Sequence, residues 1–195
     1  KNLLSSFQRS GVKYFSGATV WLVEADKSVS FLKNGIAHQV KAKRLLISTG
    51  AQERPVPIPG WTLPGVMGAA AADVLLKSSG AVPSGRVVIA GSGPLMWLAA
   101  SRFAETEVNI LAVLETVNFS NYLKALPYLP NALRASEYLK KGFKIKMQLR
   151  KADIPVLSGV QNLHAQGIKG LEKLDFTHRG NSKSLELDTL LIHEG

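Results

Sequence analysis

The chain has 195 residues, of which 46% are hydrophobic and 19% charged, so it can bury a sizeable core and is not disordered as a whole. It contains no cysteine, which excludes a disulfide framework, a cysteine zinc site and a dithiol redox centre within this segment. No apolar run approaches the length needed to cross a bilayer, so no membrane-spanning segment is expected.

The formal net charge of +10 raises the question of a nucleic-acid partner. The lysines and arginines are scattered along the chain, and no aromatic residues are interleaved with them for base stacking. We therefore expect no nucleic-acid partner. Within the one local concentration, charges alternate with apolar residues over 144–150, which predicts a strand with one solvated face. Lys140 and Lys141 before Gly142 are typical of a helix C-terminus.

The first fifty residues predict a short helix and a small antiparallel meander. The expected helix covers 2–10, and the expected strands cover 18–24, 28–32 and 37–49, the last with room for a fourth strand. Asp26-Lys27 and Asn34-Gly35 are the expected hairpin turns. The apolar run 44–50 is typical of a buried parallel strand.

Residues 51–65 are dense in proline and glycine, which excludes a helix or a central strand there. This stretch predicts a semi-rigid extended linker and therefore a domain boundary. An alanine-rich helix over 69–79 follows and is ended by Gly80. Trp61 is expected to anchor the linker by packing rather than to stack on a ligand.

Alternating units fill the rest of the chain. The expected elements are a strand at 86–90, a helix at 94–105, strands at 108–115 and 143–149, a helix at 131–141, and strands at 160–168, 171–178 and 184–193, with a turn at 179–181. This order predicts an α/β fold, a Rossmann-like parallel sheet with helices closed by an antiparallel β-meander.

A glycine turn between the strand at 86–90 and the following helix is the strongest chemical signal. Gly91 would make the tight turn, Gly93 would let a pyrophosphate approach, and Pro94 suits the first helical position. The candidate NAD-type cofactor-binding residues of this turn are Gly91, Ser92, Gly93, Pro94 and Leu95.

Met96 and Glu115 bear on whether the glycine turn binds a dinucleotide, and on which one. Met96 replaces the third glycine or alanine of the dinucleotide fingerprint, and should push the helix away from the strand or narrow the cleft. A turn that has kept its shape and lost its ligand is the alternative. Glu115 ends the second strand and could bind an adenosine ribose, or be a solvated strand end. Because no Arg or Lys follows closely, NAD is favoured over NADP.

Other candidate residues precede the linker or are isolated. Gly50, between Thr49 and Ala51, permits close approach to a cofactor or simply makes a turn, and Arg54 could pair with a phosphate or cap the linker. The four histidines have no metal-ligand spacing, so no metal site is expected. No serine or acidic pair is marked as catalytic, and the catalytic residues stay unknown.

Three runs carry a resemblance to a known family. They are Leu-Ile-Ser-Thr-Gly-Ala-Gln-Glu-Arg-Pro at 46–55, Pro-Gly-Trp-Thr-Leu-Pro-Gly-Val at 59–66 and Gly-Ser-Gly-Pro-Leu at 91–95. The chain resembles the two-dinucleotide-domain flavoproteins of the pyridine nucleotide-disulfide oxidoreductase superfamily. The second run looks most like the FAD-containing subunits of opine oxidases, hydrogen cyanide synthase and related amine or proline dehydrogenases.

The resemblance implies that 1–58 is the C-proximal part of an FAD-binding domain, whose Thr-Gly-Ala motif is Thr49, Gly50 and Ala51. Residues 59–195 would be an NAD(P)-binding-type domain. The chain opens at Lys1 rather than Met and stops at Gly195 after a strand-like run, so both ends look like cuts. The glycine loop for the FAD pyrophosphate would lie before Lys1, and this chain alone is not expected to hold FAD.

Three functions are expected for this chain, of which the first two follow from the resemblance and the third belongs to a different class. The first is a fragment of a flavin-dependent subunit that oxidises an amine or amino-acid-like small molecule, paired with a second oxidoreductase subunit. The second is an NADH-dependent flavoprotein reductase, and the third is a scaffold for subunit docking that binds no nucleotide. A cytoplasmic location is expected, with any membrane association through a partner.

Overall fold

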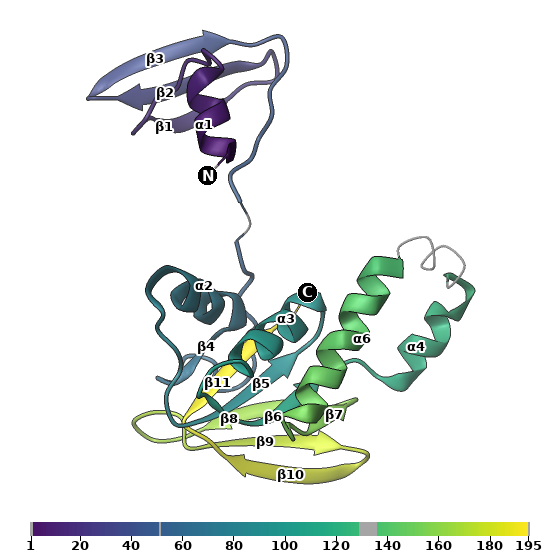
Figure 1. Ribbon diagram of the computed structural model, residues 1–195. Coiled ribbons are helices and arrows are strands. Elements are labelled where there is room, and N and C mark those ends of the chain that lie inside the picture. The colour runs from purple at the N-terminus through teal and green to yellow at the C-terminus, as the bar shows by residue number, and fades with distance from the viewer. Residues whose placement is uncertain (1, 51, 129–135, 195) are drawn as a thin grey trace. The chain divides into compact units, whose positions relative to one another are not determined.

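The computed structural model describes residues 2–50, 52–128 and 136–194. The chain divides into two compact units, Lys1–Ala51 and Gln52–Gly195 (Figure 1). This division falls seven residues before the predicted boundary at 58/59, inside the proline-rich stretch. The assignment of the units to FAD-type and NAD-type domains stays a prediction.

The first unit contains the expected helix and meander. Its elements are α1 (Asn2–Arg9), β1 (Thr19–Val23), β2 (Ser28–Lys33) and β3 (Ile36–Lys41), and the strands form an antiparallel sheet in the order β1-β2-β3. Both predicted hairpin turns are present. Asn34 and Gly35 have φ values of 51° and 76°, as a two-residue turn with left-handed central residues requires. Asp26 fixes the other turn, because its Oδ1 accepts a hydrogen bond from the amide of Ser28 at 3.0 Å.

The prediction of a buried parallel strand at 44–50 is wrong for this chain. These residues form no strand, and Leu46 is 90% exposed. A strand is stable only when its backbone groups pair with a neighbour. No strand among the described residues pairs with this run, so its apolar composition alone does not make it a strand.

The second unit contains two sheets. Its helices are α2 (Ala69–Ser79), α3 (Pro94–Phe103), α4 (Phe119–Ala125), the 3₁₀ helix η1 (Leu126–Tyr128) and α6 (Ser136–Lys151). Its strands are β4 (Val66–Gly68), β5 (Arg86–Gly91), β6 (Asn109–Glu115), β7 (Val156–Ser158), β8 (Gln161–Gln166), β9 (Lys173–His178), β10 (Asn181–Glu186) and β11 (Thr189–His193). The parallel sheet has the order β4-β11-β5-β6-β7, and an antiparallel sheet has the order β10-β9-β8. The predicted α/β class with a parallel sheet and a meander is therefore confirmed.

Three layers build this unit (Figure 1). Helices α2, α3 and α6 cover one face of the parallel sheet, and the β8–β10 sheet covers the other. Successive side chains of a strand point to opposite faces. Thus Val87 and Ile89 of β5 join the core under the helices, while Val88 and Ala90 join the core against the second sheet. Burial on both faces explains why β5 reads as a continuous apolar run.

The prediction of a strand at 143–149 and of a helix end at Gly142 is wrong. These residues lie inside α6, and of the helix predicted at 131–141 residues 131–135 lie outside the described part of the chain. Ile145 and Leu149 are four residues apart, so one helix face carries both into the core beside α3. Gln148 fixes the pair of helices, because its side-chain amide donates to the carbonyl oxygen of Ser101 at 3.2 Å. The alternation of charged and apolar residues is compatible with the period of a strand and with the period of a helix. Packing against α3 selects the helix.

We expect Ile145→Ala to lower the free energy of unfolding by about 2 kcal/mol, because it leaves a cavity under α6. Met147→Ala should change it by less than about 0.5 kcal/mol, because Met147 is 45% exposed on another face of the helix. Urea denaturation of the two variants measures both values. In a strand, Met147 would share a face with Ile145, so equal losses would contradict the helix.

An ion-paired contact joins α2 to α3. Asp73 accepts a hydrogen bond from Arg102 Nη1 at 2.6 Å and also pairs with Lys77. Burial raises the pKa of the Asp73 carboxyl, but the hydrogen bonds and charges of Lys77 and Arg102 outweigh it and hold that pKa below its ordinary value. The carboxylate is therefore ionised at neutral pH and ties the two helices on the same face of the sheet.

No helix in the described part of the chain has the length and apolar character needed to span a membrane. Residues 2–50, 52–128 and 136–194 also contain no group of three or more acidic or histidine side chains that could hold a metal ion.

Candidate dinucleotide site

The glycine turn lies at the carboxyl edge of the parallel sheet, where β5 ends and α3 begins. Gly91 has a φ of 131° and Gly93 a φ of 88°, and Pro94 is the first residue of α3. Gly93 is the N-cap and has no side chain with which to cap the helix, so the first turn of α3 presents its amides to whatever lies in front of it. The backbone therefore has the shape that the sequence predicted for Gly91, Ser92, Gly93, Pro94 and Leu95; their cofactor role stays a prediction.

Gly91 is required by the protein's own backbone. A Cβ at this position would lie 1.7 Å from the carbonyl oxygen of His193 in β11. That oxygen accepts a hydrogen bond from the amide of Ser92 at 2.8 Å, and the carbonyl of Gly91 accepts one from the amide of Thr116 at 2.8 Å. The turn is thus held between β11 and the end of β6.

Met96 lies in the interface between helix and sheet, and not in the cleft. Its side chain is completely buried in the core that contains Ile89 and Leu191. Of the two predicted effects, a narrowed cleft is therefore wrong. A glycine or alanine at this position would let the helix pack closer to the strand, and the methionine side chain fills that space instead.

The carboxylate of Glu194 lies beside the turn, which sequence reasoning missed. Glu194 Oε2 accepts a hydrogen bond from Ser92 Oγ at 3.0 Å, and its Oε1 accepts one from Thr116 Oγ1 at 2.9 Å. Glu194 thereby bridges the glycine turn and the residue that follows β6. Its position directly after an apolar strand was the available signal, because parallel strands present the residues after them at one edge of the sheet.

Glu115 ends β6 as predicted, but it is only 2% exposed, so the alternative of a solvated strand end is wrong. Its Oε2 accepts a hydrogen bond from Ser158 Oγ at 2.6 Å. Ser158 also lines a pocket of about 460 Å³ together with Asn118, Thr177 and Arg179. Glu115 thus lies behind the pocket wall, and its predicted contact with a ribose remains a prediction. The preference for NAD rests on the absence of a cation directly after Glu115 in the sequence, whereas the fold adds Arg179 of the β9–β10 turn to the lining of this pocket.

A hydrogen-bonded pair of Glu53 and His193 lies at the same edge, and sequence reasoning missed it as well. Glu53 Oε1 lies 2.8 Å from His193 Nδ1, and both side chains are largely buried. The Glu53 carboxylate also accepts hydrogen bonds from the amide of Ala70 at 3.1 Å and of Ala71 at 3.3 Å. It therefore caps α2 from outside the helix, where a negative charge is favourable. His193 was expected to be a surface or strand residue; it is a strand residue but is not on the surface.

The predicted FAD-side residues are not gathered into a described cradle. Thr49 and Gly50 lie exposed in the first unit, and Ala51 lies outside the described residues. Arg54 belongs to the second unit, where it lines a pocket of about 250 Å³ with Trp61. The described residues therefore show no fit to FAD, and the FAD role of this group stays a prediction.

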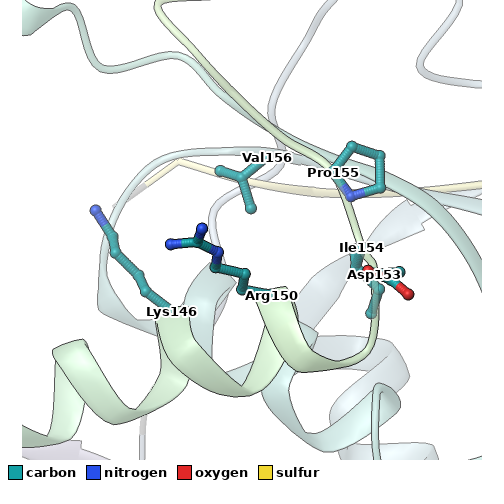
Figure 2. A pocket seen from close by; sticks show the side chains of 6 residues that line it. All are labelled: Lys146, Arg150, Asp153, Ile154, Pro155 and Val156. Carbon is teal, nitrogen blue, oxygen red and sulfur yellow. The ribbon is translucent and has the colours of Figure 1, made fainter.

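A further cleft of about 410 Å³ lies at the opposite edge of the parallel sheet. Figure 2 shows its lining, in which Lys146 and Arg150 of α6 stand opposite Pro155 and Val156 at the start of β7. Lys146 Nζ also lies 4.9 Å from the centre of the Trp97 ring. This cleft is at the amino end of β7, and so it is separate from the glycine turn at the carboxyl edge.

Solved structures of similar fold define the class. A NAD-dependent persulfide reductase from A. fulgidus has a TM-score of 0.59 at 13% identity, and the match covers 98% of this chain and 33% of that protein. The bacillithiol disulfide reductase from Bacillus cereus has a TM-score of 0.58 at 18% identity, covering 100% and 54%. These likenesses show the fold. Together with the sequence relatives below they establish that the chain belongs to the superfamily of FAD- and NAD(P)-binding oxidoreductases, as the resemblance predicted.

The sequence relatives point to a narrower group of proteins within this class. The chain is 37% identical to the A subunit of opine oxidase from Rhizobium meliloti over 203 residues, covering 100% of this chain and 38% of that protein. It is 37% identical to the A subunit of opine oxidase from Agrobacterium tumefaciens, covering 99% and 40%. The HcnB subunit of hydrogen cyanide synthase from Pseudomonas aeruginosa is 44% identical over 82 residues, covering 42% and 18%. No family model matches the chain. The chain thus spans about two fifths of the length of the opine oxidase subunits that it matches.

Proposed function

We propose that the chain is part of the FAD-containing subunit of an oxidoreductase that oxidises an amine or amino-acid-like substrate and works with a second subunit. The observation that carries this proposal is the similarity to the A subunits of opine oxidases over the whole chain. An opine oxidase is named for its substrate class, and both sets of relatives are named as subunits. The first unit would be the C-proximal part of the FAD domain, and the second unit the NAD(P)-type domain.

In this proposal the flavin, when bound, supplies the transfer of the hydride from the carbon next to the amine. In this proposal the described residues hold elements of the fold in place and do not react with the substrate. Glu53 and His193 join the segment after the first unit to the last strand of the second unit with a 2.8 Å contact. Gly91 allows that last strand to pack directly on β5. These two contacts tie the last strand to the rest of the second unit.

A second candidate is an NADH-dependent flavoprotein reductase. It is favoured by the glycine turn and by the pocket beside Glu115, which Arg179 lines. The third candidate, a scaffold that binds no nucleotide, is favoured by Glu194, whose carboxylate lies beside the turn. We also propose a cytoplasmic location, with any membrane association made through a partner.

Anaerobic reduction of the bound flavin separates the three candidates. The full-length protein in its native assembly is mixed with an opine, meaning an N-carboxyalkyl amino acid, or with NADH, and the visible absorbance of the flavin is followed. We expect bleaching by the opine in the presence of the partner subunit and none by NADH. Bleaching by NADH alone would support the reductase, and an assembly that neither compound bleaches would contradict both enzymes.

A further inference from the structure

The end of β11 brings a negative charge to the place where a dinucleotide would need positive charge. Ser92 stands between the two glycines of the turn, and its hydroxyl donates to Glu194 Oε2 at 3.0 Å. The second oxygen of the same carboxylate binds Thr116. Glu194 is exposed, so this carboxylate lies at the surface beside the turn and is not part of the core.

No cation neutralises Glu194 within the described residues. Its contacts are two hydroxyl groups, and the ion pairs found in that part of the chain join other residues. A hydroxyl donor leaves the carboxylate with its full charge. Arg179 lines the pocket that Ser158 also lines, and not the glycine turn.

The pyrophosphate of NADH carries two negative charges and approaches the N-terminus of the helix after the glycine turn. The helix end contributes about half a positive charge. A carboxylate next to Ser92 brings a full negative charge to the same place, which more than offsets the attraction. The other two acidic side chains of this edge, Glu53 and Glu115, are largely buried and hydrogen-bonded, and as carboxylates they do not offset the negative charge of Glu194.

We propose that Glu194 closes the second dinucleotide turn to the pyrophosphate of NAD(P)H, so that this domain selects against anionic dinucleotides while keeping their fold. The hydroxyl groups of Ser92 and Thr116 hold the carboxylate in place. Glu194 is then a residue that sets ligand specificity by repulsion. This inference concerns the NAD-type domain alone and does not depend on the amine substrate.

The test is calorimetric titration of the full-length protein in its native assembly with NADH, ADP and adenosine. Glu194→Gln keeps the size of the side chain and removes its charge; its amide oxygen can still accept from one hydroxyl group, and its amide nitrogen can donate to the other. We expect this variant to bind NADH and ADP at least about tenfold more tightly than the wild type, as removing one nearby like charge predicts. Adenosine, which carries no phosphate, should bind both proteins equally.

The matched control is Glu107→Gln. Glu107 is exposed at the amino edge of the sheet, before β6, so the change removes the same charge far from the turn. It should leave binding of all three compounds as in the wild type. An unchanged affinity for NADH in Glu194→Gln would overturn the proposal, and so would an equal gain for adenosine, which would indicate an effect of shape. Reduction of the flavin by an opine is measured separately, so failure of either proposal is seen independently of the other.

Discussion

Replacing Gly91 with valine should lower the free energy of unfolding of the second unit by more than about 4 kcal/mol, the range of exceptional single substitutions. A side chain there would collide with the backbone of β11, because its Cβ would lie 1.7 Å from the carbonyl oxygen and 2.6 Å from the carbonyl carbon of His193. Neither atom belongs to a flexible side chain, so the strand itself must move. The φ of 131° is also a conformation that a branched residue does not adopt without strain.

Urea denaturation followed by circular dichroism measures this effect. Gly142→Ala is the contrasting variant, since Gly142 lies inside α6 and a methyl group at this position would meet no atom within 4 Å. We expect Gly142→Ala to raise the free energy of unfolding by about 0.5–1 kcal/mol, because alanine is the better helix former. If Gly91→Val unfolded at the wild-type urea concentration, the close packing of β11 on the glycine turn would be refuted.

Glu53→Ala should cost about 3 kcal/mol, because it leaves His193 without its partner and removes the cap of α2. Glu53→Gln should cost less, since its amide oxygen can still accept a hydrogen bond from the amide of Ala70. Both substitutions change a side chain that fills the space beside Gly68, where the Glu53 carboxylate leaves no room for a Cβ. Hydrogen exchange of the Ala70 and Ala71 amides, measured together with urea denaturation, locates the loss at the start of α2.

Glu107→Ala is the control for this series, because Glu107 is exposed and makes none of these contacts. It should stay within about 0.5 kcal/mol of the wild type. Unchanged amide exchange at Ala70 and Ala71 in Glu53→Ala would show that the carboxylate does not cap α2.

The contrast between β5 and α6 shows what could be predicted from the sequence. The strand, glycine turn and helix over 86–103 were predicted because each signal is local: an apolar run, two glycines and a proline at the first helical position. Residues 143–149 were misassigned because alternating lysines fit the period of a strand and also that of a helix. The contact with α3 that selects the helix involves residues more than forty positions away in the sequence.

The residues of the candidate site also fall into a group that the sequence predicted and a group that only the structure revealed. The residues of the glycine turn and Glu115 were found from the order of strand, turn, helix and strand. Glu53 and Glu194 were not, because their partners are His193, 140 residues away, and Ser92, 102 residues away. No local pattern distinguishes Glu53 from glutamates on the surface, and the position of Glu194 directly after an apolar strand was the one local signal for that residue.

The sequence by itself determined the class of fold, because hydrophobic periodicity and glycine and proline positions act over a few residues. The superfamily followed from the resemblance of three short runs to a known family. Only the tertiary structure decided that Met96 fills the helix–sheet interface, that Glu115 is buried behind Ser158 and that a carboxylate stands beside the glycine turn. The physical reason is that a parallel sheet collects the ends of strands from distant parts of the chain at one edge. The charge at that edge is therefore a property of the fold, and it bears on the ligand more directly than the turn does.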